Sequence, residues 1–181
     1  IQAADQVISF QGIMADIRKI ALGHLLMELI LKGVREESPQ QDLYGFLIAL
    51  FQNLESCKNI FNLWFYAEIH LLRLLGFQPN FSTCHHCKRP LIKTSFPRFD
   101  PLSGGLICSQ CVNSQSRKSI RLGPEALSAL QFLSEASLNA IHRLKISEES
   151  RCTMADFLTE YITYYLEQPL QSISFLKEVL S

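Results

Sequence analysis

The sequence contains no long uncharged apolar run. Its most apolar stretch, residues 20–31, lies between Lys19 and Lys32 and is interrupted by His24 and Glu28, whereas a membrane-spanning helix needs about 18 uncharged residues or more. The sequence is also poor in charge, with 19% charged and 48% hydrophobic residues, a balance typical of a folded chain and not of a disordered one. No secretory signal pattern opens it. We therefore expect a soluble protein that makes no contact with a membrane.

Motifs of common enzyme sites are also missing. There is no glycine-rich phosphate loop with its lysine, no H-E-x-x-H zinc motif and no G-x-S-x-G nucleophile elbow. The segment "PLSGGL", residues 101–106, is too short for a phosphate loop and has no lysine. We therefore expect a protein that is not an enzyme.

Cysteine is scarce, with six residues in 181. Disulfide frameworks belong mainly to short secreted chains that cannot build a core, and this chain is rich in apolar residues. A reducing compartment is therefore favoured, and we expect a cytoplasmic protein. Cys57 and Cys152 have no partner in the sequence pattern and are interpreted as small buried thiols.

The other four cysteines form two matched pairs, "CHHC" and "CSQC", separated by twenty residues: Cys84, Cys87, Cys108 and Cys111. The spacing C-x2-C-x20-C-x2-C predicts a tetrahedral zinc site, because two intervening residues let both sulfurs of a pair face one ion. Four thiolates leave no position for water, so the expected Zn²⁺ is structural. A redox dithiol, two disulfides and a chance arrangement of free thiols remain as less favoured alternatives. His85 and His86 could substitute as ligands, but are expected to project outward from the first pair.

Basic residues are concentrated around these cysteines. Residues 80–121 contain one acid, Asp100, and seven basic residues, a net charge of +6 in a chain whose net charge is zero. Such a segment is expected to attract phosphates, so we predict nucleic-acid contacts by Lys88, Arg89, Lys93, Arg98, Arg117, Lys118 and Arg121. Phe81, Phe96 and Phe99 lie among them and suit exposed bases of single strands. The alternatives are a solvated basic face and phenylalanines that pack against the rest of the protein.

Apolar periodicity elsewhere predicts a mainly α fold with about six or seven helices. Helices are expected over residues 10–34, with His24 as a core histidine, from Ser38-Pro39 to residue 54, and over residues 59–76. Further helices should follow Gly123-Pro124, occupy residues 138–144 weakly, open at a capping box of Thr153 and Asp156, and end the chain around residues 173–180. "KISEES", residues 145–150, is interpreted as a surface turn.

Residues 80–121 lose this periodicity and gain proline and glycine. "SFPRF" and "GGLIC" flank the turn-forming "DPLS" and predict a short hairpin, which Pro97 limits to a sheet edge. We therefore predict a helical bundle with an inserted four-cysteine zinc-binding loop and hairpin module. Residues 1–79 and 122–181 would form the two parts of the bundle, and residues 80–121 the insert, in one composite domain.

The order of three stretches, "LLRLLGFQPNFSTCHHC", "FDPLSGGLICSQC" and "LQSISFLKEVLS", resembles the C-terminal part of the RecO family of bacterial recombination mediators. The resemblance covers nearly all of the chain, and its specific part is "LLGFQPNFSTCHHC" with "GGLICSQC". By this resemblance the four cysteines take the family's zinc-binding positions, which some members lack. The family normally begins with an OB-fold, and this sequence starts beyond it.

The resemblance implies a non-enzymatic role in DNA repair and homologous recombination. It implies binding to single-stranded and duplex DNA, strand annealing, and help for RecA in loading onto DNA coated with single-strand binding protein, together with RecR. It also implies capture of the acidic C-terminal tail of single-strand binding protein, and a bacterial, nucleoid-associated location. The alternative is a zinc-stabilised helical scaffold that binds an acidic partner tail without touching DNA.

Overall fold

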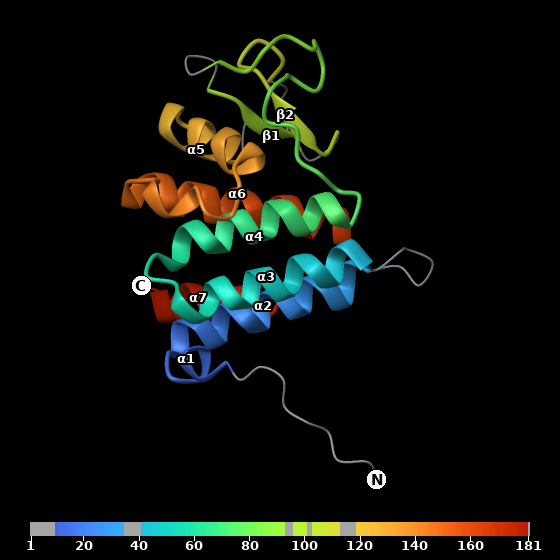
Figure 1. Ribbon diagram of the computed structural model, residues 1–181. Helices are drawn as coiled ribbons and strands as arrows, with labels where there is room; N and C mark the ends of the chain where they lie inside the picture. Colours follow the sequence, from blue (N-terminus) through green and yellow to red (C-terminus); the bar gives the residue numbers. More distant parts are fainter. Residues whose placement is uncertain (1–9, 35–40, 93–95, 101–102, 113–118, 181) are drawn as a thin grey trace.

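The architecture is described by a computed structural model over residues 10–34, 41–92, 96–100, 103–112 and 119–180. Within these residues the elements are α1 (Gln11–Met14), α2 (Ile17–Gly33), α3 (Gln41–Ser56), α4 (Ile60–Leu74), β1 (Arg98–Asp100), β2 (Gly105–Ile107), α5 (Pro124–Glu135), the 3₁₀ helix η2 (Ile141–Arg143), α6 (Glu148–Leu166) and α7 (Ser172–Leu180). The mainly α prediction with a small inserted hairpin is therefore confirmed. The helices stack on one another, and the hairpin lies at the opposite end of the molecule from α1 and α2 (Figure 1).

The first predicted helix is two helices, because Asp16 interrupts it. Asp16 is extended, and its side chain accepts the backbone N–H of Arg18, which makes it the N-cap of α2. Three large apolar residues of α2, Ile17, Met27 and Leu31, are exposed. The buried face consists of residues spaced three and four apart: Leu22, Leu25, Leu26 and Leu29. His24 points away from that face and is exposed, not a core histidine.

The centre of the fold is α4, which contacts α2, α3, α5, α6 and η2. Apolar side chains cover all of its faces, as expected of a helix enclosed by others. Asn59 caps its start, and Gly76, with φ of +85°, ends it in the left-handed conformation that glycine adopts without strain. Two polar side chains are buried on it. Asn62 donates to the carbonyls of Ile141 and Leu144, at 2.8 and 2.9 Å, whereas Glu68 remains in an apolar environment.

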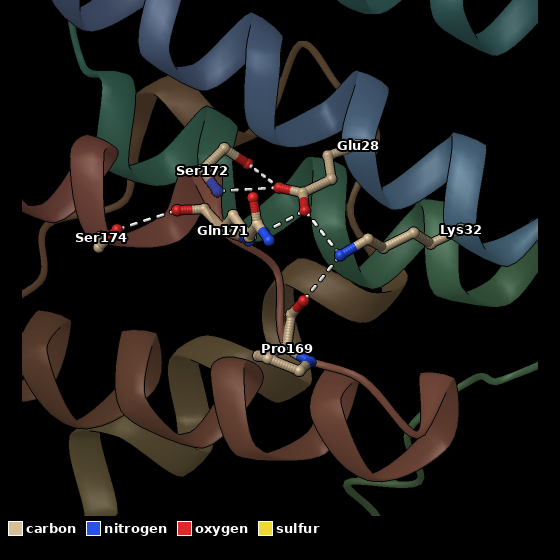
Figure 2. Close-up of polar contacts among 6 residues, drawn as sticks. All are labelled: Glu28, Lys32, Pro169, Gln171, Ser172 and Ser174. Atoms are coloured by element: carbon tan, nitrogen blue, oxygen red, sulfur yellow. Dashed lines mark hydrogen bonds and ion pairs between the residues drawn. The ribbon is translucent and has the colours of Figure 1, made fainter.

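A carboxylate on α2 caps the last helix (Figure 2). Glu28 accepts the backbone N–H groups of Gln171 and Ser172 at 2.9 and 2.8 Å, and the ammonium of Lys32 at 2.8 Å. Lys32 also donates to the carbonyl of Pro169. Partial burial raises the pKa of Glu28, but the hydrogen bonds from Lys32 and Ser172 outweigh it and bring the pKa to about 2. The start of α7 is therefore held by a charge on α2.

The same device recurs at α1. Both carboxylate oxygens of Glu55 on α3 accept backbone N–H groups, from Gly12 at 2.7 Å and from Ile13 at 3.0 Å. Lys19 on α2 donates to the backbone carbonyl of Glu55 at 2.6 Å. Short α1 therefore has its start fixed by residues distant in the sequence.

A third such cap places the start of α6 at Glu148. Ser147 is its N-cap, and Glu125 on α5 accepts from the Ser147 backbone N–H and from the Ser150 hydroxyl. The predicted capping box at Thr153 is wrong, because Thr153 lies inside the helix and its hydroxyl donates to the carbonyl of Glu149. The segment interpreted as a turn therefore contains the first residues of α6. The predicted start of α3 at Ser38-Pro39 lies outside the described residues.

The hairpin pairs β1 with β2 in antiparallel register, with Arg98 opposite Ile107. Residues 119–122 run along the other side of β1, where the Leu122 N–H donates to the carbonyl of Pro97. The sheet has two strands, so β1 is an edge strand as predicted, and residues 119–122 add only an isolated bridge between Arg98 and Arg121 on its other side. One hydrophobic core includes residues before, within and after the insert, and the division of the chain at residues 80 and 121 stays a prediction.

None of the described helices combines the length and the apolar character that crossing a bilayer requires.

Candidate metal centre and basic insert

Two tight loops turn the cysteine side chains toward each other. In the first, the Cys84 N–H donates to the carbonyl of Arg89, and the Lys88 N–H returns to the carbonyl of Cys84. Lys88 has φ of +60°, an uncommon conformation outside glycine. In the second loop the Cys111 N–H donates to the carbonyl of Cys108. Both pairs therefore form one-turn knuckles, as their spacing predicted.

The four sulfurs lie within 4.8 Å of one another, and the Cys87 and Cys108 sulfurs are 3.7 Å apart. Four ligands at about 2.3 Å from a tetrahedral Zn²⁺ would have sulfurs about 3.8 Å apart. A disulfide would need about 2.05 Å, so this separation matches shared coordination and not a covalent bond. The arrangement can bind a metal ion, and its all-thiolate donor set fits zinc.

Backbone amides stabilise one of these sulfurs as a thiolate. The Cys108 N–H donates to the Cys84 sulfur at 3.3 Å. Burial raises the pKa of Cys84, but this amide and those of Cys87 and His86 outweigh it and lower the pKa to about 6. Burial and the neighbouring thiols raise the pKa of Cys111 to about 12. Crowded sulfurs therefore oppose further deprotonation unless a cation neutralises them.

The remaining cysteines and the knuckle histidines do not join the cluster. Cys57 is half-buried and Cys152 is exposed, so the prediction of a buried Cys152 is wrong. His85 and His86 are both exposed. The His86 ring approaches the buried carboxylate of Asp100 at 3.3 Å, which is a contact that the sequence pattern did not indicate.

Aromatic side chains attach the insert to the helical body. Phe81 and Phe99 are buried, with ring centroids 5.9 and 6.0 Å from that of Phe157 on α6. The Tyr165 hydroxyl donates to the carbonyl of Gly104 at 2.8 Å. Stacking of bases on Phe81 and Phe99 is therefore excluded, and their packing role holds instead. Phe96 alone of the three is only half-buried.

The basic residues that the structure describes lie on the surface of the insert. Lys88 and Arg89 are exposed on the first knuckle, and Arg89 donates to the Gln110 side chain of the second. Arg98 and Arg121 face each other across an antiparallel bridge. The predicted contacts at Lys93, Arg117 and Lys118 lie outside the described residues.

A second cationic feature lies on the helical body, where sequence reasoning missed it. A pocket of about 570 Å³, which we call the α4 groove, is lined by Arg18, Lys58, Asn59, Ile60, Phe61, Arg151, Val179 and Leu180. The Arg151 guanidinium stacks over the Phe61 ring at 4.3 Å, and its Nε is buried without a hydrogen-bond partner. The residues come from four helices and the loop before α4, so no local pattern in the sequence could have assembled them.

Known proteins resemble this chain over most of its length. The family model described as "Recombination protein O C terminal" matches residues 14–173. The chain is similar to DNA repair protein RecO of Desulfatibacillum aliphaticivorans, with 30% identity over 175 residues, covering 94% of this chain and 67% of that protein. It is also similar to DNA repair protein RecO of Dehalococcoides mccartyi, with 27% identity, and that match covers 97% of this chain and 68% of the relative. For Roseiflexus the identity is 26%, and the match covers 94% of this chain and 59% of the relative.

Proposed function

Because this chain belongs to the RecO C-terminal family, we propose that it serves DNA repair and homologous recombination as a non-enzymatic mediator. The family match over residues 14–173 carries this proposal, since it spans the helices on both sides of the insert and all four cysteines. The chain corresponds to 59 to 68% of the length of the relatives compared above. The activities of the whole relatives are therefore proposals for this chain.

We propose that Cys84, Cys87, Cys108 and Cys111 hold a structural Zn²⁺. The ion would supply charge neutralisation and a rigid link between the two knuckles, which are separated by twenty residues in the sequence. Peptide zinc sites gain roughly 10 to 16 kcal/mol of binding energy near neutral pH, enough to order a segment with little core of its own. The protein's own contribution is the set of amides around Cys84 and the aromatic attachment to α6.

The metallated insert is the proposed surface for DNA. Four thiolates and one Zn²⁺ sum to −2, so the +6 of the side chains becomes about +4. Exposed Lys88 and Arg89 stand on the first knuckle, on an insert that lies at the end of the molecule away from α1 and α2. A compact cationic projection binds phosphates of single and double strands alike, which suits strand binding and annealing.

The α4 groove is the proposed place for the acidic tail of single-strand binding protein. Lys58 and the unpartnered Nε of Arg151 offer charge for carboxylates. Phe61, Val179 and Leu180 offer an apolar wall for a hydrophobic chain end. RecR binding, RecA loading and a nucleoid-associated cytoplasmic location rest on the family alone.

Oligonucleotide binding at two salt concentrations tests the DNA role. Changing Lys88 and Arg89 to Glu should weaken binding to both single and double strands and flatten the dependence of affinity on salt, because phosphate contacts are lost. The matched control changes Arg143 and Lys145 to Glu, two exposed residues on the helical body. Unchanged affinity of the insert variant would refute DNA binding by the knuckles.

The scaffold alternative is favoured by one observation, the buried unpartnered Arg151 Nε in a cation-lined groove. An acidic peptide with a hydrophobic C-terminus should bind the wild-type chain, and Lys58→Met with Arg151→Met should abolish that binding while leaving DNA affinity intact. Peptide binding without any oligonucleotide binding would favour the scaffold. Peptide affinity insensitive to both substitutions would remove the α4 groove as the tail site.

A further inference from the structure

Two arginines of the insert stand directly opposite each other. Arg98 and Arg121 are paired across an antiparallel bridge, so their side chains leave the same face of the strands. Like charges directly opposite each other destabilise a sheet. The opposite face carries buried Phe99, which packs against α6. On the arginine face Ile107, opposite Arg98, is buried, but Arg98 is half-buried and Arg121 is exposed, so solvent reaches both arginine side chains.

An aromatic ring stands beside these arginines in a strained conformation. Phe96 has φ of +39°, a strained conformation for a bulky residue. Its ring carries the Arg121 guanidinium at 4.2 Å from the ring centroid. Strain of this kind persists only where the surroundings hold the residue in place, and here it keeps an aromatic face beside two cations.

Together these residues line a pocket of about 350 Å³, formed by Phe96, Arg98, Ser109, Val112 and Arg121. No carboxylate is among the described residues that line it. Arg98 donates from Nη1 to the carbonyl of Ser119 at 2.6 Å, which fixes the guanidinium in position. The volume is at the lower end of the range of small-molecule sites. The pocket therefore combines fixed positive charge, an aromatic surface and room for one small group.

We infer that this pocket holds one unpaired nucleotide of a single strand, with its phosphate between Arg98 and Arg121 and its base against Phe96. The inference deepens the proposed DNA role of the insert and rests on it. Aromatic faces beside cations bind single strands because an unstacked base can lie on the ring. Bases inside a duplex are already stacked and cannot reach Phe96. The pocket would therefore distinguish single strands from duplexes, which the knuckle lysine and arginine do not.

Fluorescence anisotropy with three ligands tests this: an oligothymidylate of about 15 nucleotides, an abasic strand of equal length and a duplex. Phe96→Leu should weaken thymidylate binding about tenfold, because stacking contributes roughly 1 to 3 kcal/mol per base, and should change abasic and duplex binding less than twofold. Arg98→Gln with Arg121→Gln should weaken thymidylate and abasic binding and reduce the salt slope on these single strands by about 0.7, the value for one phosphate. Phe132→Leu, at an exposed phenylalanine on α5, is the matched control.

Photo-crosslinking of the wild-type chain with a 5-iodouracil strand removes any dependence on folding of the variants. Phe96→Tyr keeps an aromatic ring and should therefore retain wild-type affinity. A crosslink mapping to Phe96 and selective loss on thymidylate support the inference. Equal loss on thymidylate and abasic strands, no loss, or a crosslink elsewhere overturns it while leaving DNA binding by the knuckles standing. Absence of any oligonucleotide binding by the wild-type chain overturns the DNA role and this inference together.

Discussion

Replacing Glu28 by glutamine should lower the free energy of unfolding by about 2 kcal/mol at neutral pH. The glutamine keeps nearly the same size but loses the charge that holds Lys32 and the N-terminus of α7 (Figure 2). It also keeps only one oxygen acceptor where the carboxylate uses two. Because α7 packs along α2, a weakened cap should loosen the end of the chain first.

Two estimates of the magnitude agree. The pKa of Glu28 falls from 4.5 to about 2, and at about 1.4 kcal/mol per unit this corresponds to about 3.4 kcal/mol as an upper limit. The side chain is 19% exposed, so solvent screening reduces that figure, to roughly half. Loss of an N-cap alone costs about 1 kcal/mol, and a charge at a helix start adds several tenths.

The pH dependence gives the sharper test. A carboxyl whose folded pKa is lowered contributes stability that is present above its unfolded pKa of 4.5 and is lost as pH falls toward 2. Urea unfolding of wild type and Glu28→Gln should therefore differ by about 2 kcal/mol at pH 7 and converge near pH 2. The sulfur cluster also titrates, but it is common to both proteins and cancels in the difference. A difference that is absent at pH 7, or that persists unchanged at low pH, would refute the reasoning.

Three further results are expected. Burial raises the pKa of Glu68 to about 8, although Trp64 partly lowers it, so the contribution of Glu68 to stability falls as pH rises from 4.5 to 8. In thermal unfolding at pH 8, Glu68→Gln should therefore be more stable than wild type by up to about 4 kcal/mol. No gain in stability would show that Glu68 is charged in the fold. Gly104→Ala would place a Cβ against the Tyr164 ring at φ of +66°, so amide exchange in residues 96–100, 103–112 and 119–122 should accelerate while the helices stay protected. Uniform protection would contradict the close approach. Chelation, or Cys87→Ser, should open the insert and leave most helical circular dichroism intact, whereas global unfolding would show that the helices depend on the metal.

Helix content could be predicted from the sequence because apolar spacing depends on each helix alone. Helix boundaries were harder to predict, since competing caps set them. Asp16 caps α2 inside an apolar run that predicted one long helix, and Ser147 caps α6 ahead of the start that Thr153 predicted. The caps supplied by Glu28 and Glu55 join residues far apart in the chain, so only the folded arrangement reveals them.

The cysteine cluster was predictable because each knuckle is local and the two pairs match. Which aromatic side chains of the insert face solvent was not, since Phe81, Phe96 and Phe99 lie in similar basic surroundings in the sequence. Attachment to α6 buries two of them and leaves Phe96 beside Arg121. The α4 groove likewise depends on helix packing, which brings Lys58 and Arg151 together.

X-ray absorption at the zinc edge, on protein purified without added metal, tests the central claim most directly. We expect one zinc per chain with four sulfur neighbours at about 2.3 Å, and native thiol titration in which Cys152 reacts and the four cluster cysteines do not. A chain that carries no metal and exposes all four of these sulfurs to alkylation would contradict the account.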